Sequence, residues 1–243
     1  MQQQILIIGA GSSIAWAILE HWLADDSVAT VNCVSRSPQP EALNHYRERL
    51  RWLHCDYTEA SIDRVIAQLV AEKARFTTAF VCNGLLHNDS IHPEKRLEEL
   101  HADQLQAVFQ ANAVVPLLWL GRLISVLAGK QRCQVVVFSA RVGSIGDNRR
   151  GGWYSYRASK AALNMLVKTA AIEYSRRAPN VRFILFHPGT TDTPLSRPFQ
   201  RAVPAGKLFT AEFVAERLWQ LLSESADWQD PVFLDWSGQS IPW

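Results

Sequence analysis

The sequence over residues 5–15 reads ILIIGAGSSIA, and this stretch decides the fold. Its four leading apolar residues predict a short buried strand, and the glycines and serines predict a tight turn into a helix over residues 13–23. Such a turn exposes the first N–H groups of the helix, where the helix dipole favours an anion such as a pyrophosphate. The stretch departs from the common dinucleotide pattern Gly-x-Gly-x-x-Gly, because Ile14 stands at its sixth position.

The same order of strand and helix returns along the whole chain. Strands are predicted over residues 5–8, 28–35, 51–55, 78–82, 134–138, 182–186 and 232–234, and helices over 13–23, 59–75, 103–127, 155–177 and 211–222. This alternation builds βαβ units, and strands that are apolar throughout need helices on both faces of the sheet. We therefore expect a single α/β domain over residues 1–243, with a Rossmann-type, doubly wound parallel sheet of about seven strands.

Composition argues against several classes of protein. The 243 residues carry a formal net charge of +2 without a basic cluster, so neither nucleic acid nor membrane is an expected partner. The apolar stretch 111–129 includes Asn112, Pro116 and Arg122 and falls short of the roughly 20 clean residues of a membrane span. The four cysteines form no Cys-x-x-Cys pair, and the start lacks a signal-peptide pattern. A cytoplasmic protein without a metal site is expected.

The end of the second strand predicts the cofactor. An acid there binds the 2′-hydroxyl of NAD, whereas an arginine accommodates the 2′-phosphate of NADP. The chain has Arg36 at this place and no acid before Glu41. A guanidinium pairs with phosphate and stacks beside adenine. We predict NADP(H) as the cofactor and Arg36 as the reader of its phosphate; the alternative is an ordinary surface arginine.

Tyr156 and Lys160 are the strongest catalytic candidates. Four residues apart on a predicted helix, they lie on one face. A phenol with a pKa of about 10 is a poor acid–base catalyst at neutral pH, and a nearby cation favours the phenolate. Such a pair can protonate a carbonyl oxygen or remove an alcohol proton. By itself the spacing also arises by chance on exposed helices.

Together with other motifs in the same order, this pair resembles the short-chain dehydrogenase/reductase family over nearly the whole chain. The turn at Gly9 is similar to the family's Gly-x-x-x-Gly-x-Gly, with Ser13 and Ala15 in place of two glycines. The resemblance implies a cofactor site formed by Gly9, Gly11, Ser12, Ser13, Ile14, Arg36, Asp56, Tyr57, Asn83, Gly84, Tyr156, Lys160, Pro188, Gly189, Thr191 and Thr193.

The resemblance also implies catalytic roles. Asn112 would hold a proton-relay water beside Lys160, and Lys160 would also bind the nicotinamide ribose. The family has a catalytic serine as the second of a pair after the fifth strand, but here the pair reads Ser139-Ala140. Neighbouring side chains on a strand point to opposite faces, so Ser139 replaces the missing hydroxyl only if the backbone twists. Ser139 is the first candidate and Ser144 the second; Tyr156 acting alone is the third possibility.

The expected reaction is the reversible reduction of a small, largely apolar carbonyl to an alcohol. Trp153, Tyr154 and residues 194–209 would line the pocket, and residues 193–210 would form a mobile lid. In this family the helices over 103–127 and 155–177 commonly pair across a two-fold axis, which implies a homodimer or homotetramer.

The rival interpretation is a nucleotide-binding signalling or regulatory protein with little turnover. The alanine at position 140 motivates it. So does the resemblance of residues 143–154 and 235–243 to the C-factor-like and carbonyl-reductase-like branch. We expect the aromatic-rich end, residues 235–243, to pack on the domain or on a partner subunit.

Overall fold

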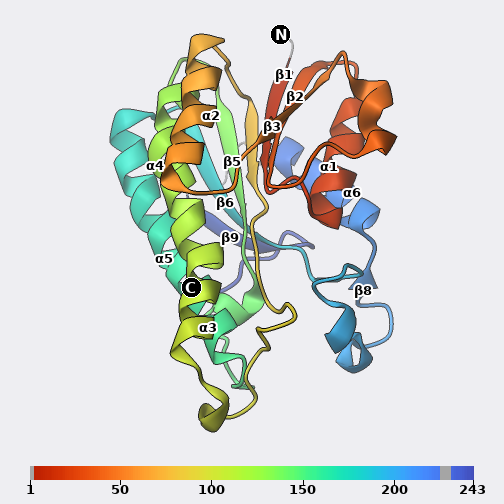
Figure 1. Cartoon of the computed structure of the whole chain (residues 1–243), viewed down its shortest axis with the longest axis vertical. Coiled ribbons are helices and arrows are strands. Elements are labelled where there is room, and N and C mark those ends of the chain that lie inside the picture. The colour runs from red at the N-terminus through yellow and green to blue at the C-terminus, as the bar shows by residue number, and fades with distance from the viewer. Residues whose placement is uncertain (1–2, 225–230) are drawn as a thin grey trace.

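A computed structural model describes residues 3–224 and 231–243 and contains a seven-stranded parallel sheet (Figure 1). Its strands are β1 (Gln3–Ile8), β2 (Val28–Ser35), β3 (Leu50–His54), β4 (Thr78–Val81), β5 (Cys133–Phe138), β6 (Val181–His187) and β9 (Val232–Asp235). Their order, β3-β2-β1-β4-β5-β6-β9, reverses between β1 and β4. Ligands of open parallel sheets bind in the crevice at such a reversal, outside the carboxyl ends of the strands. The predicted fold class and all seven strands are confirmed.

Helices cover both faces of the sheet. They are α1 (Ser13–Leu23), α2 (Glu59–Ala71), α3 (Ala102–Phe109), α4 (Val115–Leu127), α5 (Tyr154–Arg177) and α6 (Ala211–Glu224). Helices α1 and α6 pack together on one face, and α2, α4 and α5 pack on the other (Figure 1). Alternate residues of β1 enter the two cores, since Leu6 and Ile8 face α4 whereas Ile5 and Ile7 face α1. This arrangement explains why the strands are apolar throughout.

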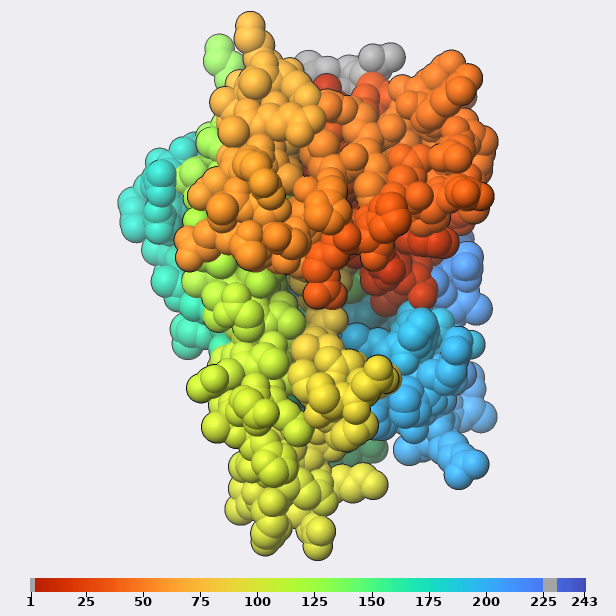
Figure 2. All heavy atoms as spheres, viewed as in Figure 1, coloured from red at the N-terminus to blue at the C-terminus, as the bar shows by residue number. Residues whose placement is uncertain are grey.

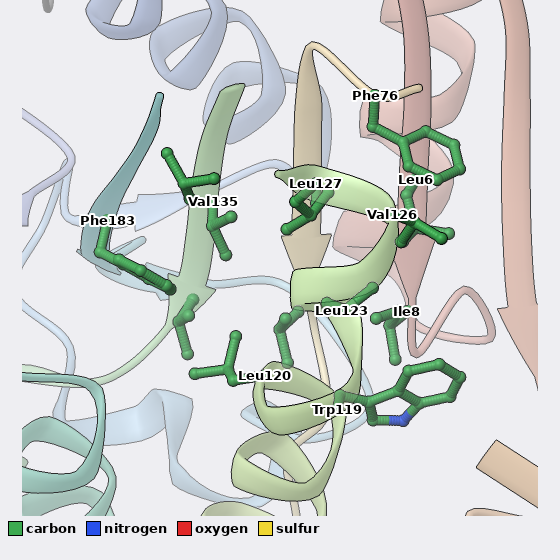
Figure 3. Close-up of a cluster of buried hydrophobic side chains, with 14 of the residues drawn as sticks. Leu6, Ile8, Phe76, Trp119, Leu120, Leu123, Val126, Leu127, Val135 and Phe183 are labelled. Atoms are coloured by element: carbon green, nitrogen blue, oxygen red, sulfur yellow. The ribbon is translucent and has the colours of Figure 1, made fainter. Parts of the chain in front are cut away.

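The inner face of α4 anchors the larger core. Trp119, Leu120, Leu123 and Val126 are fully buried and pack against strand residues such as Leu6 (Figure 3). Residues Ala102–Leu127 are long and apolar enough to pass as a membrane span by composition. Their apolar side chains are used in this packing, as expected for a core helix.

The helix predicted over residues 103–127 is not one regular α-helix. A π-helical turn, η3 (Gln110–Val114), separates α3 from α4. Pro116 has no N–H and cannot donate to the carbonyl of Asn112 four residues earlier, so the α-helical ladder is interrupted here. Single π-turns of this kind are frequent at functional sites, and this one carries Asn112.

Residues 193–210 contain structure that the sequence did not predict. They form a 3₁₀ helix, η5 (Arg197–Ala202), and the short strand β8 (Leu208–Phe209), which pairs with β7 (Thr190–Thr191). Strands of two residues carry no periodic signal. The remaining 3₁₀ segments are η1 (Glu41–Tyr46), η2 (Leu97–Glu99) and η4 (Arg141–Gly143).

The end of the chain packs on the domain, as predicted. Ile241 is buried in the core beneath α5, and its N–H donates to the carbonyl of Phe233. The ring of Trp243 lies 4.5 Å from the Lys168 ammonium, which projects from α5. The tail therefore joins the edge strand β9 to the catalytic helix.

Gly143 permits the close contact between η4 and α5. A Cβ at this position would lie 2.8 Å from the backbone carbonyl carbon of Lys160. We expect Gly143→Ala to lower the free energy of unfolding by about 1–3 kcal/mol, because overpacking forces the two segments apart. Gly121→Ala is the control, since a Cβ there meets no atom within 4 Å and alanine favours a helix. Chemical denaturation measures both; equal stability of the two variants would contradict the close-contact argument.

Candidate active site

Helix α5 presents the two central candidates, and a buried acid holds its first turn. The N–H of Trp153, whose φ is +53°, donates to the carbonyl of Glu94 at 2.5 Å. The Glu94 carboxylate accepts hydrogen bonds from the N–H (3.1 Å) and the hydroxyl of Ser155. A negative charge is favoured at a helix N-terminus. Glu94 therefore positions the turn that carries Tyr156. Sequence reasoning missed Glu94, because nothing distinguishes it from the exposed acids nearby.

Tyr156 and Lys160 lie near each other, the first half-buried and the second buried. The Lys160 ammonium is 6.0 Å from the centroid of the Tyr156 ring and donates to the carbonyl of Phe138 at 2.8 Å. Burial raises the pKa of Tyr156 to about 12 and lowers the pKa of Lys160 to about 8. The sequence argument that the lysine favours the phenolate is overridden here, because burial penalises both charged forms. At neutral pH the phenol keeps its proton.

Asn112 connects three segments of the site. Its side-chain oxygen accepts from the N–H of Leu85 at 2.7 Å, and its amide donates to the Leu85 carbonyl at 2.8 Å and to the Ser159 hydroxyl at 3.0 Å. A Cβ at Gly84 would lie 4.0 Å from both the Asn112 oxygen and the Lys160 ammonium. The structure therefore brings Asn112, Gly84, Tyr156 and Lys160 together.

The two candidate serines differ in their position and in their hydrogen bonds: Ser139 lines the cavity, whereas Ser144 is not among the described lining residues. The Ser139 hydroxyl donates to the side-chain oxygen of Asn164 on α5 at 2.6 Å. The Ser144 hydroxyl oxygen accepts from the N–H of Asp147 at 3.1 Å. A hydroxyl has one proton to donate, and Ser139 uses it on Asn164. Ala140 lines the cavity beside Tyr156 without offering a hydrogen bond.

The glycine turn after β1 lies where the strand order of the sheet reverses, and its backbone packs closely against the neighbouring segments. Gly9 has a φ of +82°, and a Cβ there would lie 2.9 Å from the N–H nitrogen of Asn83. Gly11 is also tight, since its Cβ would approach the Ser35 hydroxyl to 3.3 Å. The Ser12 hydroxyl caps α1 by accepting from the N–H of Ala15 at 3.2 Å. The next N–H groups, of Ser13 and Ile14, have no intrahelical acceptor, so they suit an anion.

Arg36 and Tyr57 lie side by side beyond β2 and β3. The guanidinium carbon of Arg36 is 5.7 Å from the centroid of the Tyr57 ring. The Tyr57 hydroxyl donates to the carbonyl of Val34 at 3.4 Å, and burial raises its pKa to about 12. The neighbouring Asp56 accepts from the N–H and the hydroxyl of Thr58, and these bonds lower the pKa of Asp56.

Two buried oxygens at the carboxyl edge lack a partner among the described residues. They are the side-chain oxygen of Asn83 and the hydroxyl of Thr191. Gly189, with a φ of +76°, makes the turn that leads to Thr191 and to the buried Thr193. Buried polar atoms are almost always hydrogen-bonded. A nucleotide bound along this edge, next to the turn at Gly9, could supply the missing hydrogen bonds of these two atoms.

A cavity of about 610 Å³ opens beside Tyr156. Among the lining residues are Leu86, Lys95, Ala140, Val142, Arg150, Trp153, His187, Leu195, Pro198, Phe199, Arg201 and Pro204. The ring of Trp153 contacts those of Tyr156 and Phe199, with centroids 6.2 and 4.9 Å apart. Trp153 and eight of residues 195–204 thus line the cavity as expected, whereas Tyr154, Arg197 and Gln200 are not among the lining residues that the structure describes. His187 was missed from the sequence; burial is the main reason that its pKa falls to about 4.

Comparison with known proteins agrees with this geometry. Residues 3–203 match the sequence profile of the family described as short chain dehydrogenase. The chain is 24% identical over 250 residues to the vibriobactin-specific 2,3-dihydro-2,3-dihydroxybenzoate dehydrogenase of Vibrio cholerae, covering 93% of this chain and 91% of that protein. It is 30% identical over 135 residues to the C-signal protein of Myxococcus xanthus, covering 56% and 76%.

The fold is also similar to that of solved structures. The NADPH-bound carbonyl reductase from chicken fatty liver superposes with a TM-score of 0.85 at 20% identity, covering 100% of this chain and 99% of that one. The family profile covers most of the chain, and the sheet order and the placement of Asn112, Tyr156 and Lys160 agree with the predicted resemblance. The chain belongs to the short-chain dehydrogenase family of oxidoreductases.

Proposed function

We propose that the protein is an NADP(H)-dependent oxidoreductase that transfers a hydride between the nicotinamide and a small carbonyl or alcohol substrate. One observation carries the proposal: the half-buried Tyr156 lies beside the buried Lys160, close to the hydrogen-bonded Asn112 side chain, at the wall of a cavity with many apolar lining residues. A protein that only binds a nucleotide has no need of a half-buried phenol facing a substrate-sized space.

The cofactor would lie along the carboxyl edge of the sheet. The N–H groups of Ser13 and Ile14 would hold its pyrophosphate, and Arg36 its 2′-phosphate. The remaining contacts would come from Asp56, Tyr57, Asn83, Lys160, Thr191 and Thr193. The absence of an acid at the end of β2 and the NADPH in the similar chicken structure both support NADP(H). When bound, the nicotinamide supplies or accepts the hydride.

Tyr156 would supply the proton in the direction of reduction. Burial keeps its pKa at about 12, so the phenol is protonated at neutral pH and can donate to the substrate's carbonyl oxygen. The Lys160 ammonium would stabilise the resulting phenolate and, with its pKa lowered to about 8, return a proton to it. The Asn112 side chain is occupied by Leu85 and Ser159, so its main-chain carbonyl, to which Pro116 cannot donate, would hold the relay water.

A second candidate function is that of a signalling or regulatory protein with little turnover. Two observations favour it: Ala140 offers no hydroxyl to the substrate oxygen, and Ser139 is bonded to Asn164. Loss of one positioned donor costs around a hundredfold or more in turnover. The similarity to the C-signal protein also favours this alternative.

Tyr156→Phe separates the two candidates. Removing the phenolic proton should lower kcat for carbonyl reduction by about 100- to 10,000-fold, with little change in NADPH binding. NADPH oxidation on a panel of aldehydes and ketones and fluorescence titration of NADPH measure the two effects. Tyr154→Phe, on the same helix turn, is the control and should keep full activity. If the biological role survives Tyr156→Phe, the protein is a regulator.

Arg36→Ala tests the cofactor. Loss of a charge-assisted contact to the 2′-phosphate should weaken NADPH binding by about 10- to 100-fold and leave NADH binding nearly unchanged. Arg47→Ala removes another cation that follows the same strand and serves as the control. Nicotinamide fluorescence gives both dissociation constants. An equal loss for the two cofactors would assign the phosphate to another residue.

We further propose a homo-oligomer formed through α4 and α5. Val114, which ends η3 just before α4, and Met165 and Ile172 on α5 are outward apolar residues that are 38%, 64% and 56% exposed. Met165→Glu should yield a monomer, because it places a charge in the contact. Val70→Glu, at an exposed apolar position on α2, is the control. Sedimentation at micromolar concentration measures the mass; a monomeric wild type would contradict the proposal.

A further inference from the structure

In the described part of the chain, the charged residues that line the cavity beside Tyr156 are all positive. Lys95, Arg150 and Arg201 line it, and none of the lining residues that the structure describes is acidic. The three side chains are exposed at the mouth, and none forms an ion pair within residues 3–224 and 231–243. Arg157 adds to the positive potential near Arg150. Its pKa is lowered mainly by burial and to a smaller extent by the charge of Arg150.

The three cations come from separate segments that meet around one pair of rings. Lys95 follows Glu94, whose carbonyl accepts from the N–H of Trp153, and Arg150 lies three residues before Trp153. The ring of Phe199 packs on Trp153 at 4.9 Å, which brings η5 and Arg201 to the same end of the cavity. Figure 2 shows the segment after β4 (yellow) against residues near 200 (blue). His87 joins the two, 3.2 Å from the carbonyls of Pro194 and Leu195.

Several acids on these segments are engaged elsewhere, and the exposed Asp89 and Glu98 are not among the described lining residues. Glu94 is bonded to Ser155 beneath α5. The remaining bonded carboxylates are those of Glu99 with the Lys95 N–H and Arg96, of Asp147 with Arg141, and of Asp192 with Gln200. Like charges around a concave apolar surface raise the local concentration of anions. A negative group that enters the cavity would therefore be attracted by the positive charges that line it.

We infer that the substrate is a carboxylate-bearing carbonyl or alcohol compound. Its apolar body packs on Trp153 and Phe199, and its carboxylate, at the end away from the reacting carbon, binds Lys95, Arg150 and Arg201. A guanidinium pairs with a carboxylate through two parallel hydrogen bonds. The 2′-phosphate of the cofactor is not the anion in question, because Arg36 and Tyr57 are not among the cavity-lining residues that the structure describes. Ile14 also lines the cavity, and the proposed function assigns the cofactor's pyrophosphate to the N–H groups of Ser13 and Ile14 rather than to the three cations. The inference rests on the proposed function and names its substrate class.

The test compares 3-formylbenzoate with its methyl ester, which differ in charge and little in shape. We expect kcat/KM with NADPH to favour the acid by about tenfold and to fall roughly three- to tenfold for the acid in each of Lys95→Gln, Arg150→Gln and Arg201→Gln. The values for the ester should stay within about twofold. Rising salt should reduce the preference. Arg197→Gln is the matched control, since Arg197 lies on η5 with Arg201 but is not among the described lining residues.

A binding measurement separates this inference from the proposed function. Calorimetry with each probe and NADP⁺ should give tighter binding of the acid in the wild type and no preference in the triple variant. No preference in the wild type, or a preference unchanged in the triple variant, would overturn the anionic substrate. Equal turnover of the acid and the ester would also overturn the anionic substrate, but it would leave the proposed reductase activity intact. Preferential binding of the acid without turnover would support the anion site and reject the reductase.

Discussion

The three hydrogen bonds of the Asn112 side chain are the interaction on which the site depends. They tie the π-turn η3 to the chain after β4 through Leu85 and to α5 through Ser159. The amide is fully buried, so an unpaired atom there would cost about 1–3 kcal/mol. This cost holds Gly84, Lys160 and Tyr156 in one arrangement, and the interruption of the helix at Pro116 is what allows Asn112 to reach them.

Besides the Asn112 hydrogen bonds, two residues outside the site fix the position of α5. Glu94 holds the first turn of α5 through Ser155, and Gly143 lets η4 lie against Lys160. Both act on the backbone of the catalytic helix rather than on the reacting atoms. As a result, the Tyr156 phenol and the Lys160 ammonium are both largely shielded from water. Their pKa values therefore move apart, that of Tyr156 up to about 12 and that of Lys160 down to about 8, and the neutral form of each group is favoured.

The cavity lacks a hydroxyl at position 140 and has only positively charged residues among its described charged lining. Position 140 offers no hydroxyl, and the Ser139 hydroxyl is bonded to Asn164. In the proposed reaction, Tyr156 would therefore be the donor to the substrate oxygen. Lys95, Arg150 and Arg201, which form no ion pair within the described part of the chain, line the same cavity as the Trp153–Phe199 pair. A tightly held anionic end would orient the substrate and offset part of the missing contact at its reacting end, because orientation lowers the barrier to reaction.

The sequence by itself determined the parallel sheet, the glycine turn and the order of the motifs, because these depend on local periodicity and on residue type at fixed spacing. Apolar strands and the turn at Gly9 need no distant partner to be recognised. The tertiary structure alone decided the hydrogen bonds of the Asn112 side chain, the role of Glu94, the bond between Ser139 and Asn164, and the presence of Lys95, Arg150 and Arg201 around one cavity. Each depends on segments between 25 and 106 residues apart in the chain. Such contacts, and the burial that shifts the pKa values of Tyr156 and Lys160, exist only once the chain has packed.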